Sequence, residues 1–241
     1  MQHKCESSYE IKAIVKEEKE RERTNSEKNK EKRVRSAFKE FSKSGWLPYL
    51  VDFDISRLEI TALSKRDPVF IDNFIYRKYC EKNYHCCRKL KKRLDGYFKV
   101  ENHYYKSFSI LYKNSEFFGC CMMLFALIEQ KLRLHAASDG QPDNLVPKAL
   151  DGIFKNMDFK YGIYSSHPSR VLCQKALSYL MNVYYKSAEG FVCEPDSMNR
   201  NFLLHGMAKR QYTHKDCIQL MCILDYLCHF EEERKVYNEQ L

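Results

Sequence analysis

Three polar side chains between residues 196 and 216 have the types and the spacing that phosphate chemistry uses. Arg200 and Asn201 are adjacent, and four residues separate Arg200 from His205 in the stretch RNFLLH. A guanidinium beside the free amide groups of a helix start attracts a phosphate, and an imidazole can accept or donate a proton near neutral pH. These three residues are therefore candidates for a reaction at a phosphate group.

A short helix is expected to carry these side chains. Asp196 or Ser197 is expected to cap its first amides, and Gly206 is expected to end it. Arg200 would then open the helix and His205 would end it, about 7.5 Å apart along the axis and separated by roughly 140° around it. Because a cation at the N-terminal end of a helix is unfavourable, we expect another group to hold Arg200.

A strongly basic segment precedes this motif. Residues 77–113 contain eleven lysines and arginines and three acidic residues, a net charge of +8, whereas the whole chain has a net charge of +9. Tyrosines are interleaved with these cations, and the combination suits a phosphate backbone with stacked bases. We therefore predict that Lys89, Lys91, Lys92 and Arg93 bind a nucleic-acid substrate. The alternative is a solvated, lysine-rich helix face with half-buried tyrosines.

The spacing of apolar residues predicts an all-α fold with three regions. A charged helix or disordered arm is expected over 1–43, an N-terminal helical region over 44–98 and a helical bundle over 99–241. Asp67 is expected to cap the first long helix and Gly96 to end or kink it, and Thr213 to Asp216 are expected to start the last helix. Helices are expected over residues 69–94, 102–114, 116–136, 145–157, 169–186, 197–205 and 214–237.

The eleven cysteines indicate a reducing compartment. Their number is odd, they include adjacent pairs, and the N-terminus MQHKCESSYE lacks an apolar signal core, so we expect free thiols in the cytoplasm. The cluster of Cys80, His85, Cys86 and Cys87 lacks the CxxC spacing of structural zinc sites, and we predict neither a metal nor a cofactor. Glu129 interrupts the longest apolar run, so no membrane span is expected.

Residues 196–228 resemble the HEPN (higher eukaryote and prokaryote nucleotide-binding) superfamily. The resemblance rests on the pattern NRNxLLHG, a short gap, an aromatic residue, a threonine and a leucine-rich helix containing LDYL. The helix ending in ALIEQKLR is similar to the other polar helix of that superfamily, so the resemblance covers roughly 100 to 238. It implies an up-and-down helical bundle that forms a homodimer and brings two motifs together in one cleft, with the N-terminal helical region added to it.

This resemblance also implies a function. Many HEPN proteins are metal-independent endoribonucleases of phage defence, toxin–antitoxin and CRISPR systems. By analogy, His205 would act as general base or acid on the ribose 2′-hydroxyl or the leaving 5′-oxygen, Arg200 would stabilise the phosphorane, and Asn201 would orient one of them, with Glu129 and Asn199 in support. The products would carry a 2′,3′-cyclic phosphate and a 5′-hydroxyl.

Two other interpretations of the motif stay open. A noncatalytic HEPN module would bind RNA, a nucleotide or a protein partner. In an ordinary structural role, Arg200 would pair with Glu129 and His205 would be a satisfied hydrogen bonder. An antitoxin or a phage-derived trigger is a possible protein partner, but HEPN toxins silenced by a nucleotidyltransferase carry a tyrosine where this chain has Met207. His214 is expected to be a surface residue at the start of the last helix.

Overall fold

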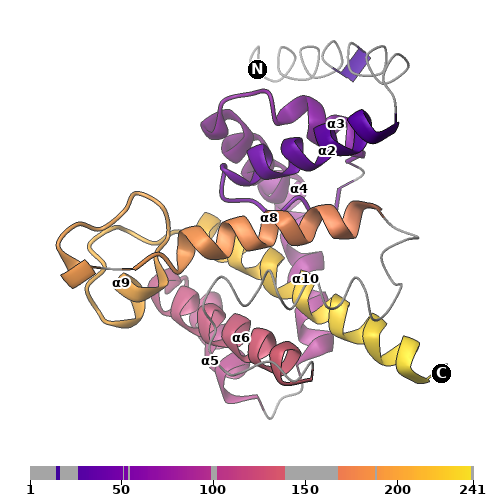
Figure 1. The fold of residues 1–241 in the computed structure, drawn as a ribbon. Coiled ribbons are helices and arrows are strands. Elements are labelled where there is room, and N and C mark those ends of the chain that lie inside the picture. Colours follow the sequence, from indigo (N-terminus) through magenta and orange to yellow (C-terminus); the bar gives the residue numbers. More distant parts are fainter. Residues whose placement is uncertain are drawn as a thin grey trace.

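The computed structural model describes residues 15–16, 27–50, 52–53, 55–98, 102–138, 168–187 and 189–239. Their regular structure is entirely helical, as the sequence predicts, and these residues include no strand (Figure 1). The helix expected over 145–157 lies outside the described residues. The elements are α2 (Glu27–Ser42), α3 (Arg57–Leu63), α4 (Pro68–Tyr97), α5 (His103–Lys113), α6 (Phe117–Ser138), α8 (Pro168–Tyr184), the 3₁₀ turn η1 (Glu189–Phe191), α9 (Arg200–Leu204) and α10 (His214–Glu239).

The helix α10 packs against α4 and α6. Its residues from Cys217 to Cys228 are all buried, which explains the dense apolar sequence there. It runs in the same direction as α6, because Cys121 lies next to Cys217 near their starts and Lys131 pairs with Glu231 near their ends. The short turn after α5 folds α6 back against it. The HEPN-like arrangement of these helices stays a prediction.

One apolar core extends from Val34 in α2 to Phe230 in α10. Trp46 stacks on Tyr79 of α4 with ring centroids 5.5 Å apart, and the Tyr79 hydroxyl lies 3.0 Å from the Cys222 thiol of α10. Side chains from both sides of residues 43 and 98 therefore share this core, and the domain boundaries drawn there stay predictions.

The long helix α4 contains a break that the sequence did not reveal. Lys82, Asn83 and Tyr84 adopt positive φ angles of 51°, 54° and 57°, although none of them is a glycine. The start is as predicted, with the Asp67 side chain accepting a hydrogen bond from the Val69 amide. Gly96 lies one residue before Tyr97, the last residue of α4, which agrees with the helix end expected there.

The cysteine and membrane predictions agree with the described residues. Every cysteine in that part of the chain is a free thiol, and several lie deep in the core, for example Cys173 and Cys217. None of the described helices combines the length and the apolar character that crossing a bilayer requires.

Candidate active site

The short helix α9 begins at Arg200 because Asn199 caps it. The Asn199 side-chain oxygen accepts hydrogen bonds from the amides of Asn201 and Phe202 at 2.9 and 3.2 Å, and its nitrogen donates to the Lys186 carbonyl at 3.0 Å. The expected caps, Asp196 and Ser197, were therefore wrong. The cap also occupies the amides of Asn201 and Phe202, which lie at the helix start where a phosphate was expected to bind. Arg200 therefore has to bind an anion with its guanidinium.

The helix ends where the sequence predicts. His205 is its last half-helical residue, and Gly206 follows in the left-handed region with φ +69°. The Met207 amide then donates to the Phe202 carbonyl at 2.9 Å, which closes the turn. His205 is therefore the residue at which α9 ends.

Glu129 of α6 is the group that holds Arg200. The Arg200 Nε atom donates to Glu129 Oε1 at 2.5 Å, and Nη1 donates to the Asn201 side-chain oxygen at 3.2 Å. The guanidinium also lies over the Tyr185 ring, 5.9 Å from its centroid. The Arg200 and Glu129 side chains keep 25% and 15% exposure. The ion pair therefore fixes the guanidinium, while Nη2 has no hydrogen-bond partner among the described residues and stays available to an anion.

His205 is exposed to solvent at the other end of α9. Its ring packs edge-on against Phe191, with centroids 5.3 Å apart, and Phe191 in turn packs against Phe202 at 5.2 Å. Glu194 fixes the segment after the motif, because its carboxylate accepts from the amides of Lys209 and Arg210. The described contacts do not join Arg200 to His205, which agrees with their expected separation around the helix.

The four predicted substrate-binding cations of α4 lie in different environments. Lys89 and Lys92 are exposed to solvent. Lys91 pairs with Asp95 at 2.5 Å and donates to the Tyr105 hydroxyl at 3.2 Å. The prediction that they bind nucleic acid stays a prediction, and the surface positions of Lys89 and Lys92 suit it best.

Arg93 is engaged inside the fold. Its guanidinium donates to both oxygens of Asp52 at 2.6 and 2.7 Å and to both oxygens of Asp225 at 3.0 to 3.1 Å. Burial raises the pKa of Asp225, and the Arg93 guanidinium beside it acts in the opposite direction. Both carboxylates are distant from Arg93 in the sequence, so the charge pattern of residues 77–113 gave no sign of this network.

His214 is half-buried, which corrects the expectation of a surface residue. Its Nε2 atom lies 2.6 Å from the Tyr112 hydroxyl, and that hydroxyl lies 2.9 Å from the Cys87 thiol. Burial lowers the pKa of His214. The imidazole is enclosed because the first turn of α10 lies against the broken helix α4 and the end of α5, a juxtaposition that only the tertiary fold creates.

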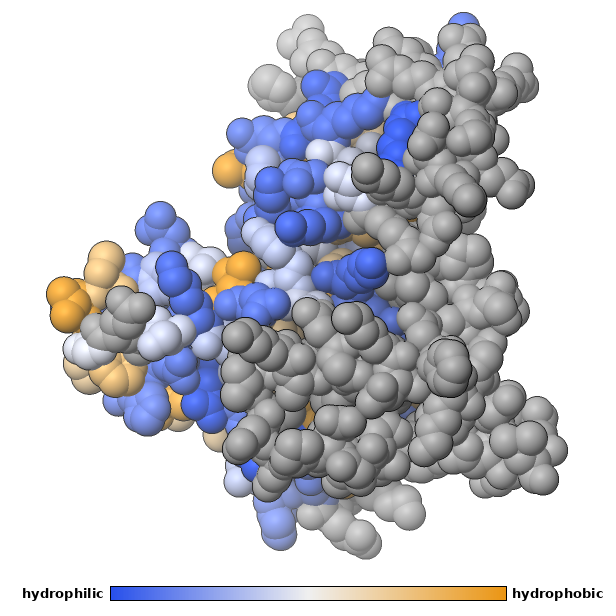
Figure 2. All heavy atoms as spheres, viewed as in Figure 1, coloured by the Kyte–Doolittle hydropathy of each residue, from blue (hydrophilic) through white to orange (hydrophobic). Residues whose placement is uncertain are grey.

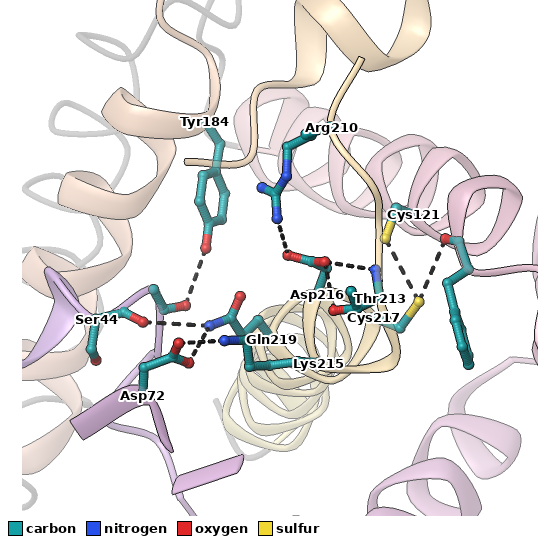
Figure 3. Close-up of polar contacts among 12 residues, drawn as sticks. Ser44, Asp72, Cys121, Tyr184, Arg210, Thr213, Lys215, Asp216, Cys217 and Gln219 are labelled. Carbon is teal, nitrogen blue, oxygen red and sulfur yellow. Dashed lines mark hydrogen bonds and ion pairs between the residues drawn. The ribbon is translucent and has the colours of Figure 1, made fainter. Parts of the chain in front are cut away.

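A second polar cluster fixes the start of α10 (Figure 3). The Asp216 carboxylate accepts from the amide and hydroxyl of Thr213 at 2.7 and 2.8 Å, which confirms the predicted capping arrangement, and also from Arg210 at 2.8 Å. Lys215 pairs with Asp72 of α4 at 2.5 Å. These groups satisfy one another, so the cluster anchors the chain that returns from α9 to the core.

The arrangement at α9 can bind and polarise an anion with Arg200 and exchange a proton through His205. The part of the chain that the structure describes contains no group of three or more histidine, cysteine or acidic side chains placed to hold a metal ion. Comparisons with models of known protein families, with curated proteins and with solved structures found no match to this chain. The geometry of the side chains therefore carries the functional proposal.

Proposed function

We propose that this chain is a HEPN-type endoribonuclease that cleaves RNA through the ribose 2′-hydroxyl without needing a metal ion. The observation that carries the proposal is the Glu129–Arg200 ion pair, which fixes a partly exposed guanidinium at one end of a helix whose other end presents an exposed imidazole. An ion pair with only a structural role would not require a solvent-accessible histidine at the opposite end of the same short helix.

The reaction follows from these two groups. His205 accepts the proton of the 2′-hydroxyl, the 2′-oxygen attacks the adjacent phosphorus, and the bond from phosphorus to the 5′-oxygen breaks. Arg200 stabilises the negative charge on the pentavalent phosphorane. The 5′-oxygen receives a proton from the His205 of a second copy. The products are a 2′,3′-cyclic phosphate and a 5′-hydroxyl, and no water molecule is consumed in this step.

A homodimer belongs to this proposal, because one His205 cannot hold both proton-transfer roles at once. Apolar surface is visible on the lobe that carries α9 (Figure 2), and Val192 and Met207, which flank this helix in the sequence, are exposed. A second copy seated there would cover these side chains. We place the enzyme in the cytoplasm, in phage defence or a toxin system, with an antitoxin or a phage-derived protein as its regulator.

Cleavage of total RNA by the purified protein in EDTA tests the activity. Arg200→Ala and His205→Ala are each expected to lower the cleavage rate by roughly a hundredfold or more. His103→Ala, which removes an exposed histidine at the start of α5, is the matched control and should cleave like the wild type. Equal cleavage by the wild type and both motif variants would remove the catalytic proposal.

RNA binding without cleavage is the second candidate, and the exposed Lys89 and Lys92 of α4 favour it. This function predicts RNA retention that weakens steeply with salt and survives both motif substitutions. Charge reversal of Lys89 and Lys92 should abolish retention. Arg93 is left unchanged in that experiment, because reversing its charge would place three acidic groups together in the fold.

A further inference from the structure

A pocket of about 790 Å³ lies where the second half of α4 faces the end of α5 and the starts of α6 and α10. Its volume is within the range of small-molecule sites, about 300–1,000 Å³. The lining comes from residues 76–95, 112–117 and 214, and it contains none of Arg200, Asn201 and His205. The pocket is therefore a different place from the candidate active site.

Aromatic rings form one side of this pocket around the half-buried His214. The rings of Tyr84, Tyr112 and Phe117 have centroids 5.5 to 5.6 Å from the imidazole, and Tyr76 lies at 6.2 Å. Tyr84 meets the imidazole edge-on, with an interplanar angle of 80°, and keeps 46% exposure. An exposed tyrosine whose ring lines a pocket offers a surface on which a planar group can stack.

The break in α4 places Tyr84 in this position. Three successive residues without glycine, Lys82 to Tyr84, occupy the left-handed region, which costs roughly 1–2 kcal/mol for each residue. The Arg88 guanidinium donates to the Asn83 carbonyl and so stabilises the break. A regular helical conformation would have a lower free energy at these three residues. The break therefore lowers local stability, and it places the ring of Tyr84 and the guanidinium of Arg88 together at the rim of the pocket.

The charge of the lining is positive. Arg88, Lys91 and Lys92 contribute three cations and Asp95 one anion. Asp95 is neutralised within the fold, because Lys91 donates to it at 2.5 Å and the Tyr105 hydroxyl donates at 2.8 Å. Lys92 follows Arg88 by four residues and has no ion-pair partner among the described residues, so both project from the same face of α4. This pair offers a binding place for a compact anion.

We propose that this pocket binds a nucleoside phosphate, with the base stacked on Tyr84 and the phosphate held by Arg88 and Lys92. A flat heteroaromatic ring joined to a phosphate matches a wall of tyrosines beside two cations. Tyr112 and His214, which lie 2.6 Å apart, also line the pocket and carry hydrogen-bonding groups for the edge of the base. The nucleoside phosphate is either a free nucleotide or an unpaired nucleotide of RNA. The assignment does not depend on cleavage, because the pocket contains none of Arg200, Asn201 and His205. Lys92 is common to this pocket and to the cations expected to bind RNA, so the Tyr84 variants are the ones that distinguish the pocket.

Isothermal titration of the full-length protein with AMP, GMP, CMP and UMP tests the assignment, with ribose 5-phosphate as the probe that lacks a base. A single-stranded octaribonucleotide forms a separate arm. Binding of mononucleotides that exceeds that of ribose 5-phosphate assigns a free nucleotide to the pocket. Binding of the octamer alone assigns an unpaired nucleotide of RNA, provided that Tyr84→Ala weakens it. Equal binding of ribose 5-phosphate and mononucleotides would overturn the proposal, since the rings would then have no part in it.

Substitutions locate the binding in the pocket. Tyr84→Ala is expected to weaken binding roughly tenfold, whereas Tyr84→Phe keeps the ring and should bind like the wild type. Lys92→Ala should weaken binding and reduce its dependence on salt. Lys175→Ala, which removes an exposed cation of α8 that does not line the pocket, should change neither. Wild-type affinity in both Tyr84→Ala and Lys92→Ala, or no binding of any nucleotide or RNA to the wild type, would refute the proposal.

Discussion

The substitution Arg93→Met tests whether Arg93 serves the fold rather than a ligand. The change keeps an unbranched side chain and removes the guanidinium that pairs with Asp52 and Asp225. Those two carboxylate side chains are 1% and 3% exposed, so they would be left in the protein interior with no cation between them. We therefore expect a large loss of stability.

The magnitude follows from the burial of the three groups. Removing one partner of a buried ion pair costs about 3–5 kcal/mol, because an uncompensated charge remains. Arg93 itself is 30% exposed, and water can reach the site once it is gone, so we expect about 3 kcal/mol, at the lower end of that range. For a chain of this length, such a loss lowers the melting temperature by roughly 6–12 °C.

The loss should also depend on pH in a definite direction. Burial raises the pKa of Asp225, and Arg93 counteracts that effect, so its removal raises this pKa further. The folded variant then takes up a proton more readily than the unfolded chain does. Because the folded variant binds the Asp225 proton more tightly than the unfolded chain does, protonation stabilises the fold. This stabilisation is present at low pH and is lost as the pH rises through the pKa of Asp225 in the folded state. The deficit of Arg93→Met should therefore be smaller at pH 5 than at pH 8.

Urea unfolding at pH 5 and pH 8 measures both effects. Lys92→Met is the matched control, since it removes an exposed cation of the same helix and should stay within about 0.5 kcal/mol of the wild type. A deficit of Arg93→Met no larger than that of the control at pH 8 would refute the reasoning. A deficit that grows as the pH falls would contradict the assigned cause.

Three further predictions concern the candidate active site and His214. Glu129→Gln should lower the free energy of unfolding by about 1 kcal/mol, because a neutral acceptor replaces the carboxylate at a partly exposed guanidinium. It should also lower RNA cleavage, and thermal unfolding should show that the variant is folded. Asn199→Ala should cost about 1 kcal/mol of cap energy and reduce cleavage, whereas Ser56→Ala, which removes the cap of α3, should cost a similar amount and leave cleavage intact. Because burial lowers the pKa of His214, the unfolded chain binds its proton first, so stability should fall as the pH drops through 6.5. Unfolding curves of His214→Gln should show a shallower fall between pH 7 and pH 5, and an unchanged slope would contradict this cause.

Local signals explain what could be predicted from the sequence. Asp67 before Pro68, Thr213 three residues before Asp216, and the glycine after His205 each place a helix end correctly. These signals work because a cap or a left-handed glycine acts within one turn of the chain. The cap of α9 was misplaced because Asp196, Ser197 and Asn199 are all suitable residues, and the contact of Asn199 with the Lys186 carbonyl decides among them.

Contacts between distant segments explain what could not be predicted. The partners of Arg93 come from a loop before α3 and from the middle of α10, and no periodicity connects them. One of the rings that contact His214 is that of Tyr84, in the break at residues 82–84, and neither glycine nor proline marks this break in the sequence. The sequence allows the Glu129–Arg200 pair as one of several possibilities, and only the packing of α9 on α6 brings the two charges together.

The chemistry of the ends produced from RNA tests the central claim most directly. Purified wild-type protein is incubated with RNA in EDTA, and the fragments are examined for their termini by mass spectrometry beside His205→Ala. Fragments bearing a 2′,3′-cyclic phosphate and a 5′-hydroxyl from the wild type, and no fragments from the variant, are the predicted result. Intact RNA with the wild type, or the same fragments at the same rate from His205→Ala, would contradict the account.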